Sequence, residues 1–266
     1  MGERIVVGAE RVLPDTLDRF EKHFAACGVG RRALCPAYGS AEATLAITMS
    51  SPADPWRTGI PAVTDDQAGT NATPVTSCGH PLPGTTVRIL GEDGQSCPDG
   101  VIGEIAVMSP SAAAGVTDAS GELRTGDAGF LRNGELFVLG RFGDAVKVQG
   151  RMVFAEDLED ALVQRGVPRD GATVLLGQRD RVTAVILCTT RQPGFADAAR
   201  RAATELLGLE ADVQVMAIAA GRVHRTSSGK PQRRRMWREF TEGALLDRDT
   251  KPARDDVDRE PEGTRA

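Results

Sequence analysis

The 266-residue sequence has few of the side chains that bind metals or form covalent cross-links. It contains three histidines and five cysteines, and no two cysteines form a Cys-x-x-Cys pair. Structural zinc sites need clustered cysteine and histidine ligands. We therefore expect no zinc site, and we expect the cysteines to be unpaired thiols of a reducing cytosol. The sequence leaves a cysteine–histidine nucleophile pair open, but no spacing favours one.

Long apolar runs and an excess of basic charge are also missing. No stretch approaches the roughly 20 apolar residues that span a membrane, and the start MGERIVVGAE lacks the apolar core of a secretory signal. The net charge is −5, whereas general nucleic-acid binding needs a basic field. We expect a cytoplasmic globular protein with neither a membrane span nor a nucleic-acid partner. The run Arg233–Arg235 is interpreted as a solvated helix face.

One lysine stands on a glycine turn in the stretch HRTSSGKPQRRR. A Walker phosphate loop needs serine or threonine directly after its lysine, but Lys230 is followed by Pro231, so this is not a Walker loop. Proline suits the first position of a helix. We predict a glycine turn that presents Lys230 at a helix start. Taken alone, the stretch is better explained by a solvated surface lysine.

Turn residues and hydrophobic periodicity divide the chain into parts. The first part alternates short strands, among them a buried strand at 4–8, with one early helix and an irregular segment at 50–76. Asn133-Gly134, between two alternating runs, is a strong hairpin signal. After Gly140 the pattern predicts a small α+β unit with three helices, beginning near Ala155, near Phe195 and after Lys230. The charged end, from 246 onward, predicts disorder.

Several motifs occur together in a definite order. They are GAE at 8–10, PAYGSAEATL at 36–45, TSCGHPLPG at 76–84, RTGDAGF at 124–130, GRFGDAVKVQGRMVFAEDLEDAL at 140–162 and HRTSSGK at 224–230. Their order and spacing resemble the late core motifs of the adenylate-forming superfamily, which comprises acyl-CoA synthetases, nonribosomal-peptide adenylation domains and luciferases. Within it, the sequence looks most like the fatty acyl-AMP ligases. The resemblance covers residues 4–240 and only the later part of a family member.

The resemblance implies a fold of class α/β plus α+β. Residues 1–140 would be the C-terminal remnant of the large AMP-binding domain, with a mixed sheet and a small β-barrel. Residues 141–245 would be the small, mobile C-terminal domain, and 246–266 a disordered tail. A strand at 4–8 that has lost its neighbours would leave an apolar face, so we expect self-association or a tight partner.

The resemblance also implies a chemistry. Family members use ATP and magnesium to convert a carboxylic acid into an acyl-adenylate, and then transfer the acyl group to a thiol. The substrate would be a fatty or other carboxylic acid, and the acceptor an acyl carrier protein or coenzyme A. The sequence does not decide the chain length of the acid or the acceptor.

The resemblance assigns roles to the residues of the first part. Gly8, Ala9 and Glu10 match the backbone that lines the adenine edge. Tyr38, on the turn with Gly39, would stack on adenine, and without the motif it would be a half-buried core tyrosine. The remaining matches are Glu42 for the magnesium on the phosphates, Asp127 for the ribose hydroxyls and Arg141 for the ribose. Their simpler readings are a helix-start carboxylate, an Asx turn cap and a surface arginine.

Two lysines and a hinge follow in the second part. Lys230 matches the lysine that bridges the carboxylate and the α-phosphate in the first half-reaction, and Lys147 matches a lysine used in the second. A solvated strand lysine is a serious alternative for Lys147. The hinge falls at Gly143 and Asp144, where members carry an acidic residue or lysine at the position of Gly143. Glycine widens the accessible backbone conformations there.

Departures from the family pattern leave two hypotheses. The glycine- and Ser/Thr-rich phosphate loop of the family, upstream of GAE, is absent from these residues, and His224 replaces a proline. In the first hypothesis the chain is the C-terminal part of an adenylating ligase that needs an N-terminal half. In the second it is a non-catalytic truncated homologue that binds a nucleotide, a carrier protein or a partner subunit. The retained side chains favour the first, and the absent loop and Gly143 favour the second for the chain in isolation.

Overall fold

A computed structural model describes residues 4–62, 73–178, 180–190, 192–227, 229–245 and 251–252. The chain divides into two units, Met1–Phe142 and Gly143–Ala266. From the sequence we placed the domain boundary after residue 140. Most of the predicted tail, 246–266, and part of the predicted irregular segment, 63–72, lie outside the described residues.

The first unit contains a mixed sheet with the order β1-β2-β3-β6. Its strands are β1 (Ile5–Val7), β2 (Leu34–Tyr38), β3 (Thr48–Met49) and β6 (His80–Pro81). The strands β1 and β2 are parallel, and the helix α1 (Pro14–Phe24) lies between them in sequence. The helix starts at Pro14, whose fixed φ suits a first helical position. Its buried residue Leu17 packs with Leu34 and Trp56 in one apolar cluster.

An antiparallel sheet with the order β10-β9-β8-β7 follows in the same unit. Its strands are β7 (Thr86–Leu90), β8 (Gly103–Met108), β9 (Leu123–Arg132) and β10 (Glu135–Arg141). The predicted hairpin is confirmed, because Asn133 and Gly134 both have positive φ, at 52° and 77°, as a type I′ turn requires. A short strand pair, β4 (Thr58–Gly59) with β5 (Val75–Thr76), completes the strands of this unit.

Two expectations for the first unit need correction. The strand β1 is not buried, because Val6 is 62% exposed and β1 stands at the end of its sheet with β2 as its neighbour. In place of the small barrel, the described residues form an open four-stranded sheet in which β7 and β10 occupy the two ends.

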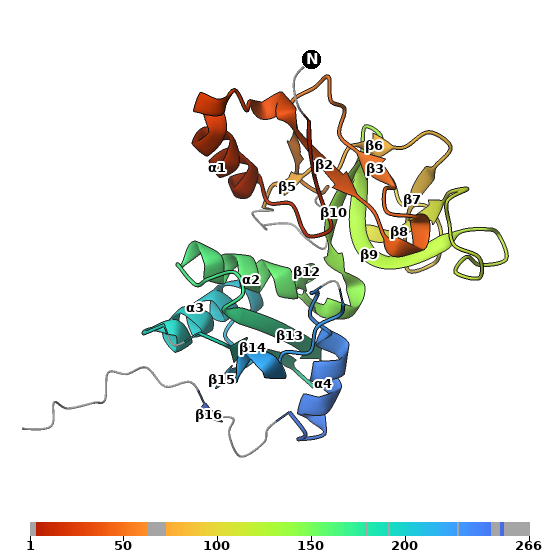
Figure 1. Cartoon of the computed structure of the whole chain (residues 1–266). Coiled ribbons are helices and arrows are strands. Elements are labelled where there is room, and N and C mark those ends of the chain that lie inside the picture. The colour runs from red at the N-terminus through yellow and green to blue at the C-terminus, as the bar shows by residue number, and fades with distance from the viewer. Residues whose placement is uncertain are drawn as a thin grey trace, which may run out of the picture. The chain divides into compact units, whose positions relative to one another are not determined.

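The second unit is a sheet covered by helices on both faces (Figure 1). After the hairpin β11 (Ala145–Val148) and β12 (Arg151–Phe154) come α2 (Ala155–Gln164), β13 (Ala172–Gln178), β14 (Val182–Cys188), α3 (Phe195–Leu207), β15 (Asp212–Ala217), α4 (Arg233–Thr241) and β16 (Lys251–Pro252). The sheet has the order β13-β14-β15-β16, and β14 and β15 are parallel. The helix α3 forms the crossover between these two strands.

The alternation of side chains along β13 and β14 explains why the sheet has an apolar core on each of its two faces. Val174 and Ile186 belong to the apolar cluster that includes residues of α2 and α3. Their neighbours Leu175 and Leu187 belong to a second cluster, which includes Met236 of α4. Because successive strand residues point to opposite faces, each strand fills both cores. The strands and helices predicted for this unit are present, apart from the predicted start of its last helix.

The short 3₁₀ turns are η1 (Ala25–Cys27), η2 (Arg31–Ala33), η3 (Ala41–Ala43), η5 (Phe142–Asp144) and η6 (Ala220–Arg222). One helix start differs from the prediction. The helix α4 begins at Arg233, after the cap residue Gln232, so Pro231 is not its first residue. Pro231 instead pairs with Arg225 in an isolated antiparallel bridge.

Candidate functional site

Three predicted site residues of the first unit come together around one carboxylate. The Tyr38 hydroxyl donates a hydrogen bond to Oδ2 of Asp127 at 2.7 Å, and Nε of Arg141 donates to Oδ1 at 3.0 Å. Asp127 lies on β9 directly opposite Arg141 of β10, and Tyr38 ends β2. The Asp127 side chain is 15% exposed, and that of Arg141 is 63% exposed. One arginine therefore faces solvent beside a largely buried carboxylate.

The environment of Tyr38 keeps its hydroxyl protonated. Burial raises the pKa of Tyr38 far above its usual range, and the Asp127 charge raises it further. The hydroxyl therefore stays protonated and donates a hydrogen bond to Asp127 at every physiological pH. A carboxylate has about four acceptor positions on its two oxygens. Asp127 consequently keeps acceptor positions on both oxygens after binding Tyr38 and Arg141.

Backbone fit explains the two glycines of this region. A Cβ on Gly39 would lie 1.4 Å from the carbonyl oxygen of Leu45, and one on Gly8 would lie 2.7 Å from that of Ala37. The carboxyl ends of the parallel strands β1 and β2 thus bring Gly8 beside the residue that precedes Tyr38. Ala9 follows with a positive φ of 69°.

The two predicted carboxylates near these turns are on the surface. Glu10 and Glu42 are both exposed, and Glu42 is the central residue of η3, three residues after Gly39. The carbonyl of Glu42 accepts a hydrogen bond from the backbone N–H of Ala113 at 2.7 Å. This bond fixes the backbone of η3 against the loop that precedes β9.

The two predicted lysines lie on separate elements of the second unit. Lys147 is exposed on β11, opposite Met152 of β12. Lys230 is exposed on the loop that leads to α4. Its backbone N–H donates to Oγ1 of Thr226 at 3.1 Å, and its carbonyl accepts from the N–H of Thr226 at 2.8 Å. The backbone at Lys230 is therefore fixed while its side chain extends into solvent.

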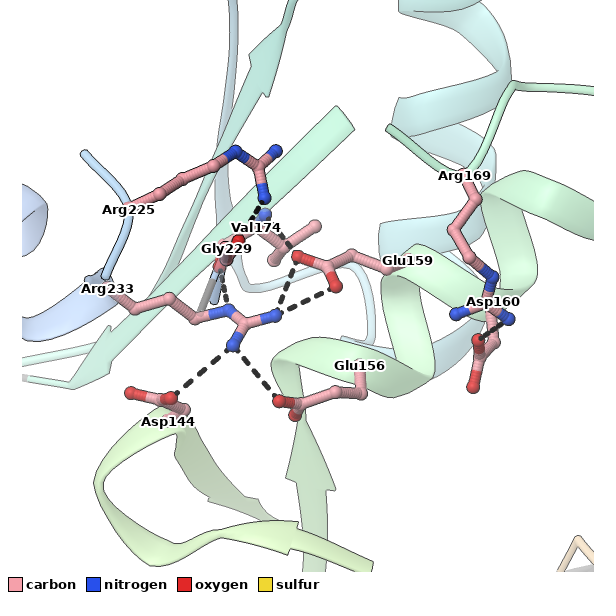
Figure 2. Close-up of polar contacts among 9 residues, drawn as sticks. All are labelled: Asp144, Glu156, Glu159, Asp160, Arg169, Val174, Arg225, Gly229 and Arg233. Atoms are coloured by element: carbon pink, nitrogen blue, oxygen red, sulfur yellow. Dashed lines mark hydrogen bonds and ion pairs between the residues drawn. The ribbon is translucent and has the colours of Figure 1, made fainter. Parts of the chain in front are cut away.

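A buried charge cluster of the second unit was not predicted. Arg233 contacts Glu156 at 3.0 Å, Glu159 at 2.8 Å and Asp144 at 3.5 Å, as Figure 2 shows. The Arg233 side chain is only 10% exposed. The interpretation of Arg233 as part of a solvated helix face is therefore wrong. Its neighbours Arg234 and Arg235 are exposed.

The cluster perturbs its own groups. Burial, together with the charges of Glu159 and Asp144, raises the pKa of Glu156 to about 7 against the opposing charge of Arg233. Oε2 of Glu156 is buried without a hydrogen-bond partner in the described chain. A sequence signal for the cluster existed, since Glu156 and Glu159 lie three apart on one helix face. Their partner stands more than 70 residues later, however, and no local pattern indicates it.

The described residues show no candidate for a protein-only metal site or a membrane span. Among them, no group of three or more His, Cys, Asp or Glu side chains is arranged to hold a metal ion. No helix in the same residues is long and apolar enough to cross a membrane. All five cysteines are free, with Cys27 exposed and Cys35, Cys78 and Cys188 buried.

Comparison with known proteins identifies the relatives of the chain. Residues 3–116 match the model of the AMP-binding enzyme family. A long-chain-fatty-acid–AMP ligase, FadD28 of Mycobacterium tuberculosis, is 30% identical over 86% of this chain and 46% of its own length. A medium-chain-fatty-acid–[acyl-carrier-protein] ligase, JamA of Moorena producens, is 30% identical over 90% of this chain and 47% of its own length. The chain thus spans about half the length of these curated relatives.

Solved structures share the fold. A structure from a study of fatty acyl-adenylate ligases of E. coli and L. pneumophila superposes with a TM-score of 0.78 at 24% identity, covering 91% of this chain and 48% of the other. An McyG A-PCP structure with phenylalanyl-adenylate gives 0.72 at 23% identity, covering 92% and 45%. At these identities the likeness establishes the fold, with its mixed sheets and helices. Residues 3–116 thus match the AMP-binding enzyme family, and the curated relatives of the chain include fatty acyl-AMP ligases.

Proposed function

We propose that the chain is the C-terminal part of an ATP-dependent ligase that activates a fatty or other carboxylic acid as its acyl-adenylate. The acyl group would pass to the thiol of an acyl carrier protein or of coenzyme A. The observation that carries the proposal is the carboxylate of Asp127, held on one oxygen by Tyr38 and on the other by Arg141. The same carboxylate retains acceptor positions for the two hydroxyls of a ribose.

The residues around Asp127 suit the rest of a nucleotide. Gly8 and Gly39 let the backbone turn closely at the ends of β1 and β2, where a flat base can approach without meeting side chains. The Tyr38 ring is held by its own hydrogen bond to Asp127, so its face is already oriented for stacking on adenine. A preorganised aromatic face loses little conformational entropy on binding.

Magnesium would be held mainly by the phosphates, with Glu42 as the carboxylate of this chain. Mg²⁺ commonly binds one or two carboxylates together with substrate phosphates. An exposed carboxylate such as Glu42 suits that arrangement better than a closed protein site. The metal would neutralise phosphate charge during attack by the substrate carboxylate.

The second unit would supply the two lysines. Lys230, on its hydrogen-bonded loop, would bind the carboxylate and the α-phosphate during adenylate formation, when negative charge develops between them. Lys147, on β11, would act in the transfer step. Gly143 and Asp144, at the start of this unit, would serve as the hinge of a small mobile domain. A compact ammonium on an exposed loop suits a group needed in only one step.

The alternative is a non-catalytic homologue that binds a nucleotide, a carrier protein or a partner subunit. The missing phosphate loop in these residues favours it for the chain in isolation. ATP–pyrophosphate exchange separates the two. The chain alone is expected to be inactive, and adding a protein that carries the phosphate loop and the rest of the large domain should restore acid-dependent exchange. No exchange with any such partner, although both proteins are folded, would favour the non-catalytic homologue.

Nucleotide binding can be tested on the chain itself. Titration calorimetry with AMP should detect binding, and Asp127→Asn should weaken it by about tenfold or more, because hydrogen bonds to a charged acceptor contribute roughly 1.5–3 kcal/mol. Asp54→Asn, at an exposed position of the same unit, is the matched control and should bind normally. Equal affinities in the two variants would contradict the assignment of Asp127.

A further inference from the structure

Arg233 joins several parts of the second unit at one point. Its Nη2 bonds both oxygens of Glu159 at 3.0 and 2.8 Å, and its Nε donates to the carbonyl of Val174 at 3.2 Å. The N–H of Val174 donates to the same Glu159 at 2.9 Å. The guanidinium, the carboxylate and the backbone N–H and C=O of Val174 therefore form a closed ring of hydrogen bonds. With Glu156 and Asp144 added, one side chain of α4 holds α2, β13 and η5.

The loop in front of Arg233 is stiffened by its own bonds. The N–H of Gly229 donates to the carbonyl of Thr226 at 2.9 Å, and the N–H of Gln232 donates to that of His224 at 2.8 Å. Nη1 of Arg225 donates to the carbonyl of Gly229 at 2.9 Å, as Figure 2 also shows. These bonds connect the described residues on either side of Lys230, so the position of the lysine depends on where the two ends of the loop are attached.

The two ends differ in the strength of their attachment. At the first, His224 contacts Glu239 at 2.8 Å, and both side chains are partly exposed, at 30% and 25%. At the second is Arg233, only 10% exposed and bound to carboxylates that are themselves 10–21% exposed. Partly exposed pairs contribute little, whereas loss of one partner from a buried cluster is costly. Of the two charged contacts that hold the loop, the one at Arg233 is therefore the stronger.

The same helix start holds the first residues of the unit. Arg233 contacts Asp144, and a Cβ on Gly143 would lie 1.9 Å from Nη2 of Arg234. Two consecutive arginines of α4 thus lie against two consecutive residues of η5. The beginning of the unit and the Lys230 loop are connected through one short segment of α4.

We propose that Arg233 is a positioning residue for Lys230, which sets the loop by tying the start of α4 to α2, β13 and Asp144. The inference rests on the proposed role of Lys230 in adenylate formation. Arg233 touches no reacting atom, and it acts by fixing where the lysine loop starts and by making that loop move together with residues 143–144.

The attachment can be tested on the chain itself by amide hydrogen exchange, read by NMR at a single pH. Arg233→Lys keeps the charge but loses the planar fork that reaches several partners at once. Exchange at Gly229, Lys230 and Gln232 should rise about tenfold or more, in line with the loss of hydrogen bonds between charged groups. Exchange in β14 should not change.

Arg238→Lys is the matched control, because Arg238 is exposed on the same helix and should leave the loop unchanged. If Arg233→Lys does not fold, Glu159→Gln is the milder variant, since it keeps the shape and removes one charge from an excess of carboxylates. It should raise loop exchange in the same direction. Loop exchange in Arg233→Lys, or in this substitute, that matches Arg238→Lys would overturn the proposal.

Kinetics in an enzyme restored by the missing half separates positioning from general destabilisation. Arg233→Lys should lower the kcat of adenylate formation by about tenfold to a hundredfold with an unchanged KM for ATP, because misplacement of a catalytic group by about 1 Å can cost up to about a hundredfold. Transfer from preformed acyl-adenylate should be unchanged. An equal loss in both half-reactions would refute positioning. If the wild-type pair forms no adenylate, the proposed function fails, and the exchange experiment still decides what Arg233 holds.

Discussion

At the scale of single residues, the buried carboxyl of Glu156 makes the stability of the second unit depend on pH. Its pKa rises from 4.5 to about 7 through burial. The unfolded chain therefore loses this proton near pH 4.5, while the folded chain keeps it until about pH 7. Between these values the folded state binds more protons, so the free energy of unfolding falls as the pH rises.

Glu156→Gln should remove this pH dependence. The full effect of the ionisation is about 3 kcal/mol at most, so the variant should gain roughly 2–3 kcal/mol over the wild type between pH 5 and pH 8. Urea unfolding at both pH values measures it. Glu210→Gln, at an exposed position of the same unit, should show no such gain. If the free energies of unfolding of Glu156→Gln and the wild type differ by the same amount at both pH values, Glu156 ionises normally in the folded protein.

The two lysines give a second test at this scale. Lys230 and Lys147 are both exposed, so replacing either by alanine should hardly change folding. In an enzyme restored by its partner half, Lys230→Ala should abolish acyl-adenylate formation and spare transfer from preformed acyl-adenylate. Lys147→Ala should show the reverse, less sharply if the acceptor approaches elsewhere. The rates of the two half-reactions in each variant measure this contrast. Equal, mild effects of both variants would show that both residues are solvated surface lysines.

At the scale of elements, local sequence rules predict what local interactions determine. The Asn133-Gly134 hairpin, α2, α3 and the alternation of β13 and β14 follow from turn chemistry and periodicity. The start of α4 was predicted wrongly at Pro231, because this residue pairs with Arg225 instead of beginning the helix. The exposure of β1 and the burial of Arg233 depend on neighbours far away in the chain. No single segment carries information about those neighbours.

The sequence also predicted only part of the candidate functional residues. The motifs indicated Tyr38, Asp127 and Arg141, and the structure brings these three side chains into contact. The cluster of Arg233 with Glu156 and Glu159 was missed. An arginine-rich helix start is usually solvated, and only the fold shows that α2 presents its carboxylates to α4.

Contacts with α4 predict different costs in stability when two glycines of the second unit are replaced by alanine. A Cβ on Gly143 would meet the end of the flexible, exposed Arg234 side chain at 1.9 Å, whereas one on Gly177 would meet the Trp237 ring at 1.8 Å. Gly143→Ala should change the free energy of unfolding by about 0.5 kcal/mol or less, because Arg234 can move aside. Gly177→Ala should cost about 1–3 kcal/mol, because it overpacks a ring held between β13 and α4. Thermal unfolding of both variants measures the contrast, and similar losses would contradict this account of Gly143.

At the scale of the whole molecule, the chain is a partial relative of longer proteins. It matches 46–47% of the length of the ligases FadD28 and JamA. Adenylate formation needs groups that order the β- and γ-phosphates, and the glycine- and Ser/Thr-rich loop that does so in the family is not among these residues. The second unit, in contrast, has apolar cores of its own, one on each face of the strands β13 and β14. The proposed ligase activity therefore draws on groups outside these residues, whereas the second unit forms its apolar core from its own residues.

We predict that the chain associates with itself through the exposed end strand of the first unit. The strand β1 ends its sheet, with β2 as its neighbour, and Val6 on it is 62% exposed. An open edge with apolar side chains is a template for pairing with another chain. We expect oligomers in light scattering together with binding of an apolar dye. Val6→Lys should reduce both, because a lysine on an edge strand opposes further pairing. Val116→Lys, at an exposed position outside the strands of the same unit, is the matched control and should change neither. A monodisperse wild-type monomer that binds no dye would show that β1 needs no cover.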